Sequence, residues 1–342
     1  MTASSARQIV LASRPEGWVV PENFSLREAA LPALAEGDVL VRAIYLSLDP
    51  YMRGRMDAAK SYAENFQVGE PLKARAIGAV AASRNGDYRE GDIVFGVLDW
   101  ADLSHVPGGN GLRPVDTSSG APLAWHLGAL GMPGMTAWVG VAMAEPKAGE
   151  TFFVSAASGA VGQIAGQIAK IRGCRVVGCA GTDAKVAYLL DDLGFDAGFN
   201  HRTQAHDLLG ALQRAAPDGL DIYFDNVGGA ILEAALDHAN TKARVTACGM
   251  ISQYNLTREE TPGVRNLTHI VRKRIRMEGF IVSDHAAKRP AFEADMAAWL
   301  KAGKIKYRVD VAEGLDAAPA AFIAMLKGDN FGKQVVRVSR EP

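Results

Sequence analysis

The sequence predicts an α/β fold that combines a doubly wound parallel sheet with a second, mainly β domain. Two patterns along the chain indicate this. Residues 36–105 consist of short extended runs separated by turn signals, whereas after residue 150 short apolar runs alternate with amphipathic helical stripes. A chain of 342 residues, 48% of them hydrophobic, is long enough for about two domains with separate cores.

The first region is expected to consist mainly of strands. Residues 39–48 alternate between inward and outward positions, and residues 92–97 form another apolar run. Residues 84–87 have the sequence Arg-Asn-Gly-Asp, which is typical of a tight turn. This pattern favours antiparallel strands joined by turns.

Residues 123–144 are mostly apolar over about the length of a bilayer span. Glycine and proline interrupt them at Gly128, Gly131, Pro133, Gly134 and Gly140. Such interruptions favour a buried, bent connection between two domains over a membrane-spanning helix.

The region after residue 150 predicts repeated βαβ units. Residues 151–156 form an apolar strand, and residues 174–180 form the next. Between them an apolar helical stripe comprises Val161, Ile164, Ala165, Ile168 and Ala169. Thr182 is expected to cap the following helix, which ends at Gly194. The remaining elements are expected as strands at 220–225, 244–248 and 275–281 and as helices at 231–239, 292–300 and 318–326.

Charge and cysteine content narrow the function classes. Thirty-seven basic and 38 acidic residues give a formal charge of −1, which leaves no overall field for nucleic acid or an anionic membrane. The basic run at residues 272–276 is therefore expected to be a solvated helix end. Three sparse cysteines, Cys174, Cys179 and Cys248, argue against a disulfide framework and for a reducing compartment. We expect a cytoplasmic protein.

A glycine-containing loop, Ala157-Ser158-Gly159-Ala160-Val161-Gly162, lies between the first predicted strand and helix of the sheet. Gly159 allows the backbone to approach a pyrophosphate, and Gly162 allows the helix to pack closely on the strand. Ala157 replaces the first glycine of the usual motif, so an ordinary tight turn is the alternative. Its position within a βαβ unit favours dinucleotide binding.

The end of the next strand distinguishes NADP from NAD. Residues 180–182 are small and neutral there, whereas an NAD site normally places a carboxylate at this point. Lys185, in the first turn of the following helix, can reach a 2′-phosphate. This favours NADP, although Asp183 keeps the NAD interpretation open and Lys185 could simply be a solvated helix residue.

Three tyrosines could supply chemistry without a metal, and no histidine or cysteine spacing typical of a metal site is found. These are Tyr51, Tyr62 and Tyr254. A phenol can hold a carbonyl oxygen and stabilise the enolate that forms when hydride adds to a conjugated double bond. Tyr254 follows the carboxyl end of a predicted strand, where open α/β sheets bind ligands. The alternative for each tyrosine is a packing role.

Six segments taken together resemble the zinc-independent medium-chain dehydrogenase/reductases. They are LSLDPYMRGRM (46–56), GMPGMTA (131–137), AASGAVG (156–162), DNVGG (225–229), GMISQYN (249–255) and KGDNFGK (327–333). Within that family they are most similar to the leukotriene 12-hydroxydehydrogenase/15-oxoprostaglandin 13-reductase branch, which includes bacterial curcumin reductase.

The resemblance implies a GroES-like β-barrel domain, residues 1–125 and 284–342, and a Rossmann domain, residues 126–283, with NADPH in the cleft between them. It implies reduction of a conjugated aldehyde or ketone, with hydride added to Cβ and a proton to Cα. It also implies homodimers that pair through the edge of the Rossmann sheet. The alternatives are an NADPH quinone oxidoreductase of the same architecture and a non-catalytic NADPH-binding protein.

The resemblance also assigns residues to parts of the site. Tyr254 would face the substrate carbonyl, and Tyr51 and Tyr62 would line the pocket. The pyrophosphate would contact Gly159, Ala160, Val161 and Gly162, and the 2′-phosphate Lys185. The nicotinamide half would contact Asn226, Cys248, Gly249, Met250, Ile251, Ser252, Phe280 and Asn330. His201 stands where relatives often carry a tyrosine beside the 2′-phosphate, so this contact is expected to be weaker or pH-sensitive.

Overall fold

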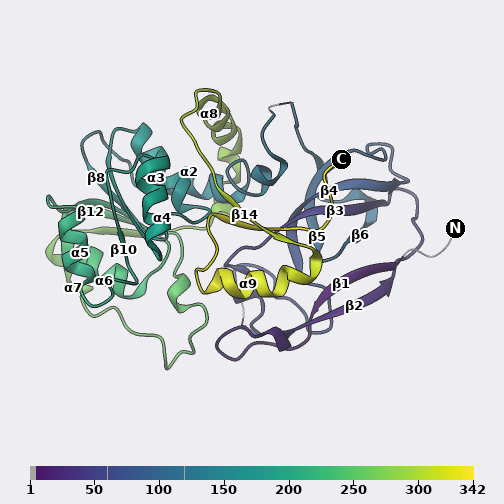
Figure 1. Ribbon diagram of the computed structural model, residues 1–342, viewed down its shortest axis with the longest axis horizontal. Coiled ribbons are helices and arrows are strands. Elements are labelled where there is room, and N and C mark those ends of the chain that lie inside the picture. The colour runs from purple at the N-terminus through teal and green to yellow at the C-terminus, as the bar shows by residue number, and fades with distance from the viewer. Residues whose placement is uncertain (1–4, 60, 119) are drawn as a thin grey trace. The chain divides into compact units, whose positions relative to one another are not determined.

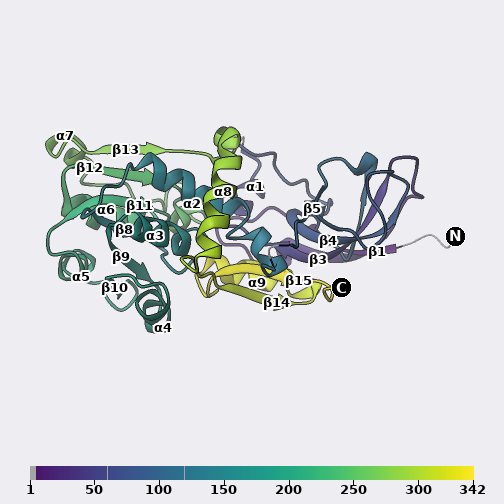
Figure 2. The same ribbon diagram turned by 90° about the horizontal axis from the view of Figure 1, so that it is seen from above.

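The computed structural model describes residues 5–59, 61–118 and 120–342, which form two compact units (Figures 1 and 2). The first unit comprises the described residues of 1–127 together with Val309–Asn330 and Gln334–Pro342. The second comprises Gly128–Arg308 and Phe331–Lys333. The sequence analysis assigned residues 284–308 to the β-barrel domain, whereas in the structure they belong to this second unit. They include Asp295, which accepts a 2.8 Å hydrogen bond from Trp138 Nε1 of the second unit.

The second unit contains a six-stranded sheet in the order β10-β9-β8-β11-β12-β13, and all of its pairings are parallel. Figure 2 shows β12 and β13 side by side. The strands are β8 (Thr151–Val154), β9 (Arg175–Ala180), β10 (Ala197–Asn200), β11 (Leu220–Asp225), β12 (Ala239–Ala247) and β13 (Arg276–Gly279). The predicted doubly wound sheet is confirmed, and β10 is a strand that the sequence analysis did not predict.

Helices cover both faces of this sheet. Successive strand residues point to opposite sides, so the apolar residues of each strand pack against helices on both faces. Phe153 and Tyr223 stack with centroids 5.0 Å apart in a core shared with α5 and α6, whereas Phe224 lies against Gly140 of α2. The α-helices are α2 (Met132–Met143), α3 (Gly162–Ile171), α4 (Asp183–Ala187), α5 (Leu208–Ala215), α6 (Gly229–His238), α7 (Thr268–Arg272) and α8 (Arg289–Lys301). Shorter turns are the π-helical η4 (Tyr188–Asp192) and the 3-10 helices η5 (Ile251–Gln253) and η6 (Val282–Lys288).

The apolar segment 123–144 is bent, as predicted. It forms the 3-10 helix η3 (Leu123–Leu127) and then α2, which begins after Gly131. A side chain at Gly134 would collide with the Ala129 backbone, so glycine is required for this close turn. Within the described residues, no helix is both long and apolar enough to cross a membrane.

The basic run 272–276 begins where α7 ends. Lys273 Nζ donates to the carbonyl oxygens of Leu236 and Asp237 at 3.0 and 2.7 Å. A cation is favourable at this position because the C-terminal carbonyls of α6 lack partners within the helix. This lysine therefore stabilises the end of a neighbouring helix.

The first unit is mainly β. Among its described residues, one sheet follows the order β14-β15-β3-β4-β5-β7 with β6 also paired to β3, and β1 and β2 form a separate antiparallel pair. The strands are β1 (Ser5–Leu11), β2 (Phe24–Ala30), β3 (Val39–Ser47), β4 (Lys73–Ser83), β5 (Ile93–Asp99), β6 (Leu103–Val106), β7 (Arg113–Pro114), β14 (Val309–Glu313) and β15 (Lys333–Arg337). Besides η3, the helices of its described residues are α1 (Met52–Arg55), α9 (Ala318–Leu326), η1 (Pro21–Asn23), η2 (Pro107–Gly109) and η7 (Leu315–Ala317).

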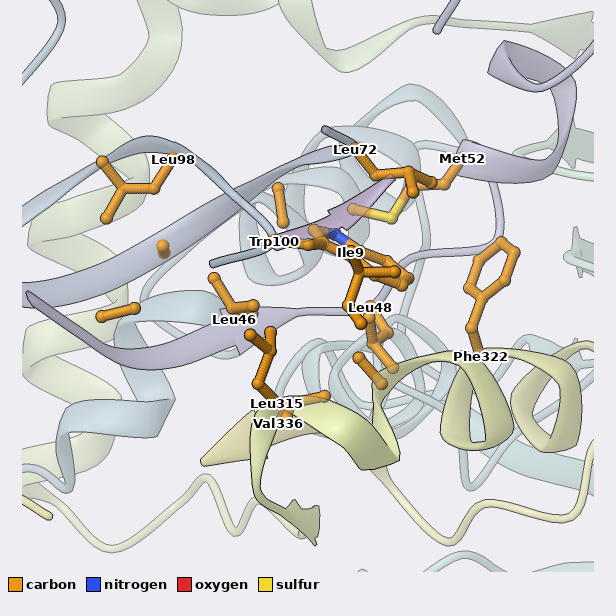
Figure 3. Close-up of a cluster of buried hydrophobic side chains, with 14 of the residues drawn as sticks. Ile9, Leu46, Leu48, Met52, Leu72, Leu98, Trp100, Leu315, Phe322 and Val336 are labelled. Atoms are coloured by element: carbon orange, nitrogen blue, oxygen red, sulfur yellow. The ribbon is translucent and has the colours of Figure 1, made fainter. Parts of the chain in front are cut away.

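Both ends of the chain build the core of this unit. Trp100 and Phe322 meet edge to face with centroids 5.9 Å apart, and Ile9, Leu46 and Val336 surround them (Figure 3). Residues separated by more than 200 positions are thereby held in one hydrophobic cluster. The predicted combination of a mainly β unit with a parallel-sheet unit is confirmed.

Candidate cofactor and substrate site

The loops after the strands of the second unit gather along the carboxyl edge of its sheet. The chain leaves β8 toward β9 and β10 on one side, and it returns on the other side through β11, β12 and β13. The order therefore reverses between β8 and β11. Open α/β sheets bind ligands at such a switch point, because the two flanking loops diverge there.

The glycine loop follows β8, as predicted, and its backbone is tightly constrained. Ala157 N–H donates to Cys179 O at 3.0 Å, and Gly159 N–H donates to Ala156 O at 2.9 Å. A Cβ at Gly162 would lie 2.4 Å from Ala156 O, so only glycine allows α3 to start this close to the strand. The start of a helix favours an anion, and α3 begins within this loop, at Gly162.

Ala157 replaces the usual first glycine of this motif, and the neighbouring strand accommodates its methyl group. A Cβ at Gly178 of β9 would lie 2.8 Å from the Ala157 Cβ. Glycine at position 178 of β9 therefore leaves room for the Ala157 methyl group. The departure from the usual motif leaves the close packing of loop and sheet intact.

His201 and Arg202 lie beside Gly181 at the end of β9, and Lys185 is near His201. Thr182 caps α4 by accepting the Lys185 N–H at 3.3 Å, as predicted, and Lys185 is buried. A methyl group at Gly181 would lie 3.1 Å from Arg202 Nε and 3.4 Å from His201 Nε2. Burial lowers the pKa of the His201 imidazole, and the charges of Arg202 and Lys185 lower it further. We call these three side chains the cationic pocket.

Arg202 was not identified from the sequence. It is the second residue after β10, the one strand of this sheet that was not predicted, and the pairing of β10 with β9 places it beside Gly181. His201 N–H donates to Ala180 O at 3.0 Å, which extends this pairing by one residue. If β10 had been recognised as the edge strand, an arginine shortly after it would have indicated a phosphate contact.

Asp183, which kept the NAD interpretation open, is hydrogen-bonded to β10 in the structure. Its Oδ1 accepts a 2.8 Å hydrogen bond from Asn200 Nδ2, which ties the carboxylate to β10. Gly181 and Thr182 after β9 are small and neutral, and Lys185 and Arg202 nearby carry positive charge. This combination suits a 2′-phosphate.

Asp225 organises the loop after β11. Its Oδ1 accepts hydrogen bonds from Tyr223 Oη at 2.7 Å, Gly228 N at 2.8 Å and Val227 N at 2.9 Å. Burial raises the pKa of this carboxyl group, and the backbone donors counteract that effect. Asn226 is held in turn, since its Nδ2 donates to Ser155 O at 2.8 Å. The predicted cofactor residue Asn226 therefore lies between the ends of β8 and β11.

The loop after β12 is tied to the loop after β11. Cys248 and Gly249 both donate their N–H groups to Asp225 O, at 2.8 and 3.1 Å. Ile251 N–H donates to Asn226 O at 3.3 Å, and Ser252 N–H to Val227 O at 3.2 Å. The structure thus brings the predicted residues Asn226 and 248–252 together at one edge.

Tyr254 lies directly over this second loop. Its Oη accepts the Met250 N–H at 3.2 Å, and a Cβ at Gly249 would lie 2.9 Å from that oxygen. Glycine at position 249 therefore makes room for the phenol. Phe280 follows β13 at the same edge, where its ring packs close to Gly140 of α2. Asn330 follows α9 in the first unit.

The other two predicted tyrosines belong to the first unit. Tyr51 precedes α1 and is half-buried, and its Oη accepts a hydrogen bond from Arg75 Nη1 at 3.0 Å. Burial raises the pKa of Tyr51, with a further rise from Asp49 and opposing effects of Arg75 and Arg55. Tyr62 is 65% exposed.

The cysteines and histidines do not form a metal site in the part of the chain that the structure describes. No group of three or more His, Cys, Asp or Glu side chains is close enough there to hold an ion. Burial raises the pKa of Cys179 and of Cys248 to about 12, which favours the protonated thiols at neutral pH.

Two family models match the chain. One, described as the N-terminal domain of oxidoreductase, covers residues 7–115, and the other, described as zinc-binding dehydrogenase, covers residues 160–302. Together with the relatives below, they show that the chain belongs to the zinc-independent branch of the medium-chain dehydrogenase/reductases.

Individual relatives match over almost the whole chain. The NADPH-dependent curcumin reductase of Escherichia coli is 44% identical over 97% of both chains. The NADP(+)-dependent 2-alkenal reductase of Nicotiana tabacum is 44% identical over 98% of both chains. Among solved structures, CurA of Vibrio vulnificus in complex with NADPH is 42% identical, covers 98% of this chain and 100% of its own, and superposes with a TM-score of 0.90.

Proposed function

We propose that this protein reduces the α,β double bond of conjugated aldehydes and ketones with NADPH, adding hydride to Cβ and a proton to Cα. The observation that carries the proposal is the carboxyl edge of the parallel sheet. It combines a phosphate-binding loop, the cationic pocket and a phenol above the loop after β12. The names of the curcumin and alkenal reductases point to the same reaction class.

The residues at this edge fit NADPH. The start of α3 offers backbone N–H groups to a pyrophosphate, and glycine at 159 and 162 leaves room for it. Lys185, His201 and Arg202 offer positive or hydrogen-bonding groups to a 2′-phosphate. We assign the nicotinamide half to Asn226, the loop 248–252, Phe280 and Asn330. When bound, NADPH supplies the hydride.

Tyr254 is the proposed catalytic residue. Its hydroxyl would donate a hydrogen bond to the substrate carbonyl oxygen, on which negative charge develops as Cβ gains hydride. The Met250 N–H holds the phenol oxygen from the loop side, which fixes the direction of that donor. Tyr51 and Tyr62 are proposed to line the substrate pocket.

The affinity for the 2′-phosphate is expected to depend on pH through His201. Its lowered pKa keeps the imidazole neutral in the free protein near neutral pH. A phosphate dianion stabilises the imidazolium, so binding takes up a proton and strengthens as pH falls. Between about pH 8 and about pH 6, affinity for 2′,5′-ADP should rise about fivefold more in the wild type than in His201→Gln, because a charged donor adds about 1 kcal/mol. Isothermal titration calorimetry measures this, with 5′-AMP as the control ligand, and equal pH profiles of the two proteins would contradict it.

We further propose that the protein is a cytoplasmic homodimer joined through β13. This strand ends the parallel sheet, and its outer edge offers backbone groups to the β13 of a second copy. Two apolar side chains are exposed at the preceding helix α7, Leu267 at its N-cap (46%) and Val271 within it (80%). Light scattering of the purified protein is expected to give twice the chain mass of 36.3 kDa, whereas a single chain mass would exclude the dimer.

The reaction is tested by following NADPH absorbance with a long-chain enal, an aryl enone and a quinone, each repeated with NADH. We expect rapid oxidation with the enal or enone and NADPH, and slow oxidation with NADH. A clear preference for the quinone would identify a quinone oxidoreductase. Tight NADPH binding without oxidation by any acceptor would identify a binding protein.

A further inference from the structure

The run of residues 304–308, in the second unit, lies along α3. Two glutamines of α3, four positions apart on one helix face, bind this run through both polar atoms of their amide groups. Gln167 Nε2 donates to Lys306 O at 2.8 Å, and its Oε1 accepts the Lys306 N–H at 2.8 Å. Gln163 pairs with Arg308 in the same way, at 3.1 and 2.9 Å. The run is thus fixed against the helix that starts at the glycine loop.

Tyr307, between the two paired residues, reaches from this run to the glycine loop. Its Oη donates a 3.2 Å hydrogen bond to Ala160 O, which is 147 positions away in the sequence. The side chain is 8% exposed, and a Cβ at Gly128 would collide with its ring. Glycine at position 128 therefore leaves room for a phenol that is held beside the loop.

The Ala160 carbonyl group belongs to the segment that the proposed function assigns to the pyrophosphate. Carbonyl oxygens carry partial negative charge and repel a phosphate group, whereas backbone N–H groups attract it. A loop that binds pyrophosphate therefore needs its carbonyl oxygens turned away from the anion. Tyr307 supplies a donor that holds one of these oxygens.

The same hydrogen bond sets the direction of a neighbouring N–H group. A trans peptide bond is planar, so its carbonyl oxygen and its N–H point in opposite directions. The peptide between Ala160 and Val161 consequently directs the Val161 N–H away from Tyr307. Val161 directly precedes α3 and is partly exposed, and its N–H donates to no acceptor among the residues that the structure describes. This N–H is available to an anion at the start of the helix.

We propose that Tyr307 is a positioning residue for the cofactor pyrophosphate, which holds Ala160 O so that the Val161 N–H faces the pyrophosphate. The inference rests on the proposed function, in which the glycine loop binds this group. It is distinct from the assignment of Lys185, which concerns the 2′-phosphate alone. Tyr307 therefore supports NADPH and NADH equally and does not contribute to the choice between them.

The test uses two fragments of the cofactor in calorimetric titrations. ADP-ribose contains the pyrophosphate but no 2′-phosphate, and 2′-AMP contains the 2′-phosphate but no pyrophosphate. Tyr307→Phe keeps the ring and should weaken ADP-ribose, NADH and NADPH by a common factor of about five, while 2′-AMP stays within about twofold. Lys185→Gln should show the opposite pattern for the two fragments. Tyr88→Phe, which also removes a phenol bound to a backbone carbonyl, Leu112 O, should bind both fragments like the wild type.

Two further readouts separate the possible failures. In enone reduction, Tyr307→Phe should raise KM for NADPH about fivefold at unchanged kcat. In hydrogen–deuterium exchange, saturating ADP-ribose should protect residues 157–162 less in Tyr307→Phe than in the wild type. Unchanged ADP-ribose affinity, equal losses for ADP-ribose and 2′-AMP, or equal protection in both proteins would overturn the role of Tyr307. The predicted binding pattern without enone reduction by the wild type would overturn the proposed function instead and leave the role of Tyr307 standing.

Discussion

Tyr254→Phe is expected to lower kcat for enone reduction by about 100-fold, the typical cost of removing one donor to a developing oxyanion. The substitution keeps the ring over Gly249 and removes only the hydroxyl that accepts the Met250 N–H. NADPH affinity should therefore change by less than about twofold, since no proposed cofactor contact is lost. Stopped-flow measurement of NADPH oxidation gives kcat, and fluorescence titration gives the affinity.

Tyr88→Phe is the matched control for this substitution. Tyr88 also has a hydrogen-bonded hydroxyl, 2.9 Å from Leu112 O, but it belongs to no proposed contact with substrate or cofactor. Its kcat should equal that of the wild type. If Tyr254→Phe, alone and combined with Tyr51→Phe and Tyr62→Phe, turned over enones at the wild-type rate, the assignment of Tyr254 would be wrong.

Lys185→Gln is expected to weaken NADPH binding by roughly tenfold to a hundredfold, because a charge-assisted hydrogen bond contributes about 1.5–3 kcal/mol. NADH lacks the 2′-phosphate, so its affinity should stay within about twofold of the wild type. The buried position of Lys185 in the first turn of α4 makes the loss larger than at an exposed site. Calorimetric titration with each nucleotide measures both values.

Lys170→Gln provides the comparison for a lysine outside the pocket. Lys170 is near the end of α3 and pairs with Asp196 at 2.9 Å on the protein surface. Its loss should leave both nucleotide affinities unchanged. Equal losses for NADPH and NADH in Lys185→Gln would instead indicate that Lys185 supports the loop rather than the phosphate.

Local pattern was sufficient to predict most of the parallel-sheet unit. Strand 220–225 coincides with β11, and in the first unit helix 318–326 coincides with α9, because apolar runs and helical stripes directly reflect burial. The Thr182 cap could also be predicted, because capping is a local interaction between residues three positions apart. In contrast, β10 has four residues of which only Asn200 is buried, and it shows little periodicity.

Several contacts around the proposed site join residues that are distant in sequence. Arg202 lies beside Gly181 because β10 pairs with β9, and Arg75 reaches Tyr51 across 24 positions. The role of Asp225 also depends on the neighbouring loops, since it receives hydrogen bonds from backbone groups that only the folded turn brings together. Such contacts leave no periodic pattern in a single sequence.

The most direct test of the central claim is the position of deuterium in the product. An aryl enone would be reduced with NADPH that carries deuterium at both C4 positions, and the product would be examined by NMR. The account predicts a saturated ketone with one deuterium at Cβ and the carbonyl intact. Deuterium on the carbonyl carbon of an allylic alcohol would show carbonyl reduction and contradict the account.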